Sequence, residues 1–169
     1  RGYYARSIPA KNLKVLSLFG FPYDSLNFFN LLKTWDPMGQ LEWLKRELSK
    51  SEANDEDVVI ISHIPVSGDF SIDVWNDAFN ALLDRYQNTV TAIFSAHTHD
   101  DHVKFHTSHQ DPNKVIAVDF IGPSLTTYSG HNPSFRVFTI DAETNQVLDY
   151  TQYRLNLDFW NKQDPSAKA

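Results

Sequence analysis

Two stretches of the chain decide its fold: VVIISHIP at Val58–Pro65 and VTAIFSAHTH at Val90–His99. Each begins as a run of apolar residues typical of a strand buried on both faces, and each ends in histidine. Between them, residues 73–86 have the apolar spacing of an amphipathic helix. A strand–helix–strand unit with a right-handed crossover places the carboxyl ends of its two parallel strands at one edge of the sheet.

Three histidines follow these strands directly, namely His63, His97 and His99. His97 and His99 are two residues apart, so an extended backbone would point both toward one face, and His63 should reach the same edge from the neighbouring strand. Imidazole is the commonest protein ligand for zinc-like metals. The sequence therefore predicts a metal site at this edge. Candidate hydrogen-bond partners for the second ring nitrogens are Thr98, Asp100 and Asp101.

Composition narrows the class of protein. The chain has 169 residues, 41% of them hydrophobic, which suffices for one compact domain or most of one. A net charge of -6 and the lack of any basic run argue against binding a nucleic-acid polymer. The sequence contains no cysteine, which excludes disulfides, thiolate metal sites and cysteine nucleophiles. It begins with Arg1 rather than Met, so we expect a processed product or a piece of something longer.

Other segments complete an α/β pattern. Residues 13–18 read as a buried strand, and Asp36 is expected to cap a helix with Pro37 at its first position. After His99 come four strands without a helix between them, so that half should be largely antiparallel. The residues expected on the buried faces of the two helices are Leu41, Leu44 and Leu48 in the first, and Val74, Phe79, Leu82, Leu83 and Tyr86 in the second.

Two further segments carry expectations of their own. The aromatic-rich stretch 19–35 is expected to pack in the core, although it is also the one candidate surface for membrane contact if the substrate is a lipid. Beyond Leu157 the chain becomes polar, and we expect it to fray.

The residues alone leave two kinds of metal chemistry open. Three histidines can hold a single zinc ion and activate water, as in a single-metal hydrolase or hydratase. Phosphoryl chemistry usually uses two metals with bridging carboxylates, and no carboxylate here ends an earlier buried strand. The chain therefore supplies part of a two-metal site at most.

The two histidine segments resemble the Gly-His-x-Pro and Gly-His-x-His blocks of the calcineurin-like metallophosphoesterases. The resemblance is closest to the acid sphingomyelinase-like phosphodiesterase branch, where six ordered blocks match over nearly the whole chain. These blocks are Gly2-Tyr3-Tyr4, Asp36-Pro37-x-Gly39-Gln40-Leu41-x-Trp43-Leu44, Ser62-His63-Ile64-Pro65, His97-Thr98-His99, Gly122-Pro123-Ser124-Leu125-Thr126-Thr127-Tyr128 and Asn132-Pro133-x-Phe135-Arg136-Val137.

The resemblance implies a fold and a cofactor. The fold is part of the α/β/β/α sandwich with mixed sheets, residues 1–157 being the C-terminal half of the catalytic domain and residues 158–169 a polar tail. Two divalent metal ions, zinc in this branch, would be bound, one by His63 and His97 and the other by His99. The family's Asp-x-His, Gly-Asp and Gly-Asn-His blocks are absent here, so a partner segment, the N-terminal half of the same domain, would supply the remaining ligands and the general acid.

The resemblance also implies a reaction, hydrolysis of a phosphodiester by a metal-activated hydroxide. The substrate is a sphingomyelin-like lipid or a nucleotide phosphodiester. Substrate-binding candidates are Tyr128, whose ring suits a quaternary ammonium group, Asn132, and His131, which stands where the branch has a bland residue. Family members of this branch are secreted or lysosomal, and we expect the same here. The alternative is a catalytically incomplete fragment or subunit that needs a partner chain.

Overall fold

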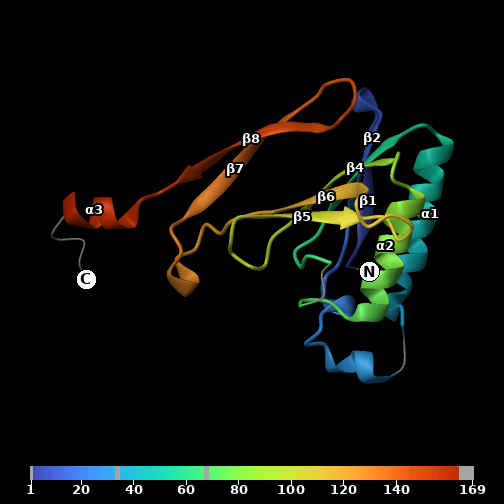
Figure 1. Cartoon of the computed structure of the whole chain (residues 1–169), viewed down its shortest axis with the longest axis horizontal. Coiled ribbons are helices and arrows are strands. Elements are labelled where there is room, and N and C mark those ends of the chain that lie inside the picture. Colours follow the sequence, from blue (N-terminus) through green and yellow to red (C-terminus); the bar gives the residue numbers. More distant parts are fainter. Residues whose placement is uncertain (1, 33–34, 67–68, 164–169) are drawn as a thin grey trace.

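The computed structural model describes residues 2–32, 35–66 and 69–163. Six strands form one mixed sheet in the order β1-β2-β3-β4-β6-β5, helices α1 and α2 cover one face, and the β7–β8 hairpin lies on the other (Figure 1). The strands are β1 (Tyr4–Ile8), β2 (Leu13–Ser17), β3 (Asp57–Ile61), β4 (Val90–Ser95), β5 (His102–Thr107), β6 (Val115–Ile121), β7 (Ser134–Ile140) and β8 (Val147–Arg154). The helices are α1 (Gln40–Ala53), α2 (Asp73–Arg85) and α3 (Leu157–Gln163), with short 3-10 turns η1 (Pro9–Lys11), η2 (Phe21–Tyr23), η3 (Phe28–Leu32), η4 (Pro37–Gly39) and η5 (Tyr128–Gly130).

The direction of the strands sets the position of the site. β2, β3, β4 and β6 run parallel, whereas β1 and β5 pair antiparallel at the two edges of the sheet. The predicted α/β fold with mixed sheets is thus confirmed, with β3–α2–β4 as its strand–helix–strand unit. The expectation of a largely antiparallel second half holds for β5–β6 and β7–β8, while β6 also joins β4 in parallel. The sequence did not predict strand β1.

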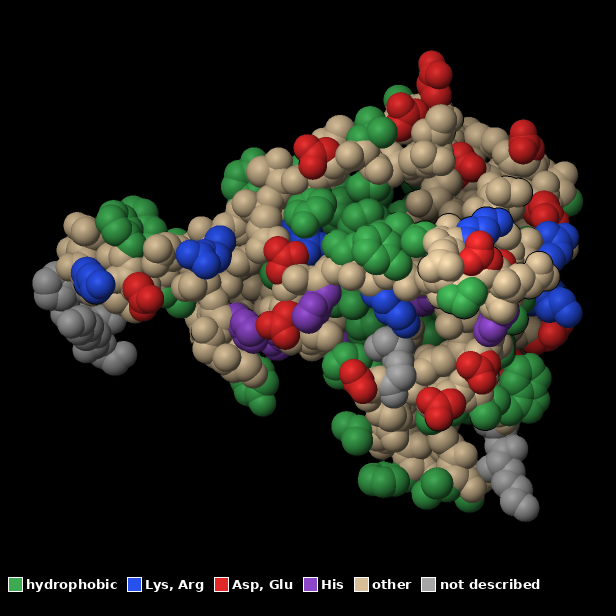
Figure 2. Space-filling model, in the orientation of Figure 1, with side chains coloured by type: hydrophobic (Ala, Val, Ile, Leu, Met, Phe, Trp, Pro, Cys, Tyr) green, Lys and Arg blue, Asp and Glu red, His purple; other side chains and the backbone are tan. Residues whose placement is uncertain are grey.

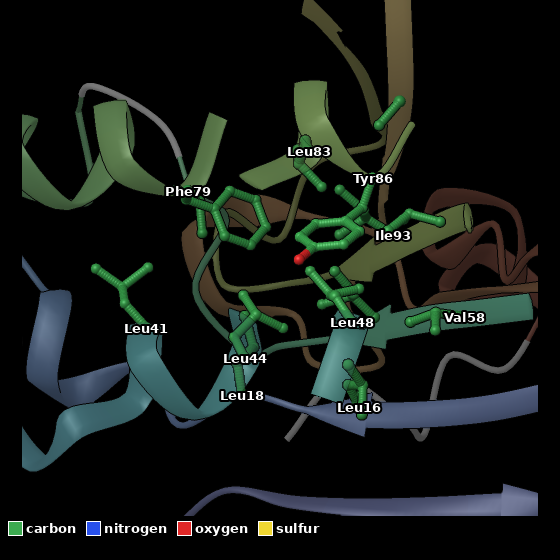
Figure 3. Packing of buried hydrophobic residues seen from close by; sticks show 14 of the residues in the cluster. Leu16, Leu18, Leu41, Leu44, Leu48, Val58, Phe79, Leu83, Tyr86 and Ile93 are labelled. Atoms are coloured by element: carbon green, nitrogen blue, oxygen red, sulfur yellow. The ribbon is translucent and has the colours of Figure 1, made fainter. Parts of the chain in front are cut away.

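The core lies between the two helices and the sheet (Figure 3). Leu44 and Leu48 of α1 are fully buried and meet the fully buried Phe79 of α2 in one cluster with the strand residues. The predicted inward position of Val74 is wrong, because that side chain is 57% exposed. Trp75 is buried in its place and stacks between Tyr23 and Phe79, with ring centroids 4.2 and 5.5 Å away.

The beginning of α1 differs slightly from the prediction. Pro37 lies in the 3-10 turn η4 before the helix, so it does not occupy the first helical position. Asp36 nevertheless caps α1, because its carboxylate accepts hydrogen bonds from the backbone N–H groups of Leu41 (2.9 Å) and Glu42 (3.1 Å). The η4 turn thus places the Asp36 carboxylate beside the first N–H groups of α1, which have no acceptor within the helix.

The β7–β8 hairpin is attached to the open face of the sheet at two places. The ring of Phe138 packs against Phe94 and Phe120, at centroid distances of 4.8 and 5.4 Å. In the turn, the Asn145 amide donates to the backbone oxygen of Lys11 (3.0 Å) and to the Asp57 carboxylate (2.8 Å). The hairpin therefore crosses the sheet and brings residues 123–134 near the histidine loop.

The segment after β8 is more ordered than expected. Residues 157–163 form the helix α3, whose first N–H, that of Leu157, donates to Asn132 Oδ1 (3.0 Å). Residues 164–169 of the predicted polar tail lie outside the described residues. Within the described part of the chain, no helix is long and apolar enough to cross a membrane.

Candidate metal centre

The loops that follow β3 and β4 are bonded to one another directly. The backbone N–H of Ser62 donates to the oxygen of Phe94 (2.9 Å), and the N–H of Ala96 donates to the oxygen of His63 (3.0 Å). Parallel pairing thus continues past both strand ends and fixes the two histidine segments side by side. This is the carboxyl edge of the sheet, where open α/β folds bind their ligands.

His63 and His97 face each other across this edge. His63 Nε2 lies 3.3 Å from His97 Nδ1, and the two rings meet edge to face with centroids 5.1 Å apart. Two imidazole nitrogens bound to one tetrahedral zinc at about 2.0–2.1 Å would lie about 3.3–3.4 Å from each other. The pair therefore fits two positions in the coordination shell of one such ion.

The backbone of the second segment is not extended, contrary to the expectation from the sequence. His97 and His99 both have left-handed backbones, with φ of 73° and 66°. The N–H of Thr98 donates back to the oxygen of Ala96 (2.9 Å), which closes a tight turn. Left-handed conformations are uncommon for residues other than glycine and often mark functional sites. The turn orients each ring separately.

His99 consequently lies apart from the close pair. Its ring packs edge-on against Tyr128, with centroids 5.8 Å apart. Among the described residues, no three His, Cys, Asp or Glu side chains are grouped so that they could hold one metal ion. A single zinc held by His63, His97 and His99 together, the single-metal alternative, is therefore not supported.

The expected partners of the site histidines bond elsewhere. Asp100 lies 3.5 Å from His102 Nε2 and 3.5 Å from His131 Nε2, and Asp101 pairs with the buried guanidinium of Arg136. Thr98 Oγ1 accepts the N–H of Asp100 (3.3 Å). Asp100 and Asp101 therefore hold the loop against β5 and the hairpin, and Thr98 closes a turn within it. In the described part of the chain, none of the three is hydrogen-bonded to His63, His97 or His99.

A hollow of about 240 Å³ opens beside His99, lined also by Asp100, His131 and Asn132. His131 reaches it through the loop before β7, while Asn132 uses its side-chain oxygen to bind α3. Tyr128 is 74% exposed and packs against His99, which lines the hollow. Two of the three predicted substrate-binding residues thus line one cavity, and the third stands at its margin.

Electrostatics favour the neutral form of His63. Partial burial, followed by the neighbouring His97 and His99 rings, lowers the pKa of His63 below its ordinary value. A neutral imidazole keeps the lone pair that a metal requires. His63 is therefore suited to act as a neutral metal ligand.

A network of buried polar side chains lies against the loop that contains His63 and is hydrogen-bonded to its backbone. The hydroxyl of Tyr23 donates to the oxygen of Ile64 (2.9 Å), and the ammonium of Lys104 donates to the oxygen of Val66. Asp119, 1% exposed, is the cross-strand partner of Lys104 and accepts a hydrogen bond from Ser95 Oγ (2.7 Å). Burial raises the pKa of Asp119 and lowers the pKa of Lys104.

This buried network was not predicted from the sequence. Lys104 and Asp119 are charged residues inside otherwise apolar strands, at 102–107 and 115–121. Such a charge in a buried run must be paired or hydrogen-bonded, and that signal could have drawn attention to them. Tyr23 gave no comparable signal, because its role depends on its contact with Ile64, 41 residues away in the chain.

A model of the family described as calcineurin-like phosphoesterase matches residues 3–101, which include β1–β4 and all three histidines. The chain belongs to the calcineurin-like phosphoesterases. The resemblance inferred from the ordered motifs is thereby confirmed.

Curated relatives carry names from one branch of this family. The chain is 33% identical over 160 residues to "Sphingomyelin phosphodiesterase A" of Dictyostelium discoideum and 38% identical over 160 residues to "Sphingomyelin phosphodiesterase" of Homo sapiens. It is 31% identical over 170 residues to the human "Cyclic GMP-AMP phosphodiesterase SMPDL3A". These alignments cover 93%, 92% and 92% of this chain but 27%, 25% and 37% of the relatives. The chain thus spans between a quarter and somewhat more than a third of the length of these relatives.

A solved structure supports the fold of this calcineurin-like phosphoesterase. A dimetal phosphatase from Danio rerio superimposes with a TM-score of 0.60 at 16% identity, over 90% of this chain and 57% of that one. At this identity the likeness concerns the fold alone.

Proposed function

We propose that the chain contributes one half of the active site of a metal-dependent phosphodiesterase. The observation that carries the proposal is the 3.3 Å separation of His63 Nε2 and His97 Nδ1 at the carboxyl edge of the sheet. Family membership gives this pair a chemical context, because the relatives named above are phosphodiesterases.

The cofactor in this proposal is a pair of divalent ions, with zinc as the expected metal. His63 and His97 would hold one ion and His99 the second. A bound pair of divalent ions supplies positive charge for the phosphoryl oxygens and acidifies water. Family membership, together with a fold shared with the dimetal phosphatase from Danio rerio, supports two metals rather than one.

The remaining ligands, in this proposal, come from the N-terminal half of the same domain. Two observations support a missing partner segment. The described residues provide no complete metal-binding group. The β7–β8 hairpin is a sheet of only two strands with exposed Phe135, Val137 and Leu148, and such a sheet is marginal by itself. If no partner segment is supplied, the chain is catalytically incomplete, which is the second candidate.

The proposed substrate is a phosphodiester, either a sphingomyelin-like lipid or a nucleotide. The matching relatives include one named as a sphingomyelin phosphodiesterase and one named as a cyclic GMP-AMP phosphodiesterase. We assign its non-reacting part to the hollow beside His99, where His131 and Asn132 provide polar groups. The exposed ring of Tyr128 suits a choline-like ammonium. Secretion or a lysosomal location is proposed by likeness to the branch.

The experiment compares the 169-residue chain with a longer form that also carries the N-terminal half. Zinc content and hydrolysis of bis(p-nitrophenyl) phosphate are measured for both. We expect the longer form to bind two zinc ions and to hydrolyse the diester. The short chain should bind fewer than two ions and should not turn over. Turnover by the short chain alone would refute the requirement for a partner segment, and an inactive, metal-free longer form would refute the proposed function.

A further inference from the structure

A cluster of large apolar side chains in the segment between β2 and α1 is exposed to solvent. Phe28 is 80% exposed and Leu31 is 78% exposed, contrary to the core packing expected for this segment. Figure 2 shows hydrophobic side chains gathered at the lower end of the molecule, where Figure 1 draws this segment in blue. The cluster, here called the apolar rim, consists of Phe21, Leu26, Phe28, Phe29, Leu31 and Leu32.

The rim is held outward by a fixed scaffold. Asn27, only 6% exposed, donates from its amide to the oxygen of Phe21 (3.0 Å) and accepts the N–H of Phe29 (3.2 Å). The amide of Asn30 donates to the oxygen of Asp24 (3.0 Å). Asn27 and Asn30 thus turn inward while the side chains of the rim point outward, the reverse of an ordinary surface loop.

Most backbone N–H groups of this segment have an acceptor within the protein. The N–H groups of residues 23–27, 29 and 30 donate within the segment or to the oxygens of Gly20 and Phe70. A lipid phase offers no hydrogen bonds, so it accepts a backbone satisfied in this way. The β7–β8 hairpin differs, because its two outer edges are unpaired within the described residues. Such edges have free backbone groups that can pair with a further protein strand.

Direct contacts connect the rim segment to the metal centre. The N–H of Ser25 donates to the oxygen of Phe70 (3.1 Å), and the ring of Phe70 packs edge-on against His97 with centroids 5.3 Å apart. Tyr23, in the same segment, bonds to the His63 loop at Ile64. A surface touching the rim therefore lies close to the candidate reaction site.

The charge of the protein indicates which kind of membrane surface the apolar rim would contact. Within the described residues 21–32, Asp24 is the one charged side chain, and the whole chain has a net charge of -6. An anionic membrane would repel such a protein, whereas a zwitterionic one would not. Binding driven by apolar burial is also insensitive to salt.

We propose that the apolar rim docks on a zwitterionic lipid surface and thereby brings the phosphodiester of a membrane lipid to the His63–His97 edge. The proposal rests on the proposed function for its substrate, but docking itself requires neither bound metal nor turnover.

The test measures co-flotation of the chain with phosphatidylcholine–sphingomyelin vesicles, without added metal. Leu31→Asp is compared with Leu148→Asp, a matched leucine on β8 that is 64% exposed. We expect Leu31→Asp to weaken vesicle binding about tenfold or more, because it loses buried apolar area. Leu148→Asp should leave binding unchanged. Both variants should keep the melting temperature of the parent, since neither leucine is buried.

Several outcomes would overturn docking while leaving the proposed function intact. These are no vesicle binding by the parent chain, equal loss in both variants, or binding that requires anionic lipid and disappears at high salt. A concentration-dependent dimer that Leu31→Asp dissolves would assign the rim to a second copy and also overturn it. In the active longer form, Leu31→Asp should slow hydrolysis of vesicle lipid but not of bis(p-nitrophenyl) phosphate. Loss of both activities would count against a docking role.

Discussion

His63 Nε2 and His97 Nδ1 lie 3.3 Å apart although the two residues are separated by 34 positions in the chain. The separation arises from parallel pairing of β3 and β4, which continues into the loops through the hydrogen bond from Ala96 N–H to His63 O. Two nitrogens held at this distance by the backbone form a preorganised pair of ligands. Most of the proposed function depends on this relationship.

Removal of either histidine of the pair should abolish tight metal binding. His63→Ala or His97→Ala is expected to weaken zinc binding by at least about 100-fold, since loss of a direct ligand should cost no less than loss of its supporting residues. The measurement is zinc titration with a competing chelator. His109→Ala, in the loop after β5, is the matched control and should bind zinc like the parent. Unchanged zinc binding in His63→Ala and His97→Ala would show that the ion is bound elsewhere.

The buried ammonium of Lys104 should matter for stability. Lys104→Met removes the hydrogen bond to Val66 O and the positive charge opposite Asp119, and we expect a loss of about 3 kcal/mol in the free energy of unfolding. The measurement is urea denaturation. Adding Asp119→Asn should restore part of the loss, because the buried carboxylate is then neutral. Additive losses in the double variant would contradict this coupling.

His106 should make the fold sensitive to acid. Burial, together with the nearby Lys104 charge, lowers the pKa of His106 to about 3, and its Nδ1 lies 2.7 Å from Asn80 Oδ1, to which it donates. The unfolded chain takes up this proton near pH 6.5 and the folded chain does not, so stability falls as pH drops below 6.5. The loss is about 1.4 kcal/mol per pH unit.

The readout for His106 is the difference between the parent and His106→Gln, which keeps an N–H donor but does not titrate. Other titrating groups cancel in this difference. Urea denaturation between pH 7 and pH 4 should give a shallower pH slope for the variant. Parallel slopes would show that His106 is protonated in the folded state as well.

Capping of α1 by Asp36 gives a further test of local structure. Asp36→Ala removes the acceptor for the N–H groups of Leu41 and Glu42 and should cost about 1 kcal/mol of stability. Asp73→Ala is the control, because Asp73 lies in the first turn of α2, where no side-chain cap bond is present. A loss of the same size in both variants would indicate a general charge effect rather than a cap.

The exposed ring of Tyr128 should act on substrate rather than on folding. In the longer, active form, Tyr128→Ala is expected to raise KM for a choline-bearing phosphodiester several-fold, by about 1 kcal/mol of lost cation–π contact. KM for bis(p-nitrophenyl) phosphate and the melting temperature should not change. A fall in the melting temperature would show that Tyr128 is structural.

The sequence predicted well whatever depends on periodicity. The apolar runs ending at His63 and His97 indicated the parallel strands, and the leucines of residues 41–48 indicated the buried face of α1. Prediction failed where tertiary contact decides. Trp75 rather than Val74 faces inward because Tyr23 and Phe79 provide stacking surfaces for a large ring. The left-handed backbone at His97 and His99 left no sign in residue type, since neither is glycine.

The central claim is that His63 and His97 bind the same metal ion. A crystal structure of the zinc-loaded protein, with an anomalous difference map at the zinc edge, tests it directly. We predict one peak at about 2.0–2.1 Å from both His63 Nε2 and His97 Nδ1. A peak bound to only one of the two rings, or zinc held solely by surface histidines such as His102, would contradict it.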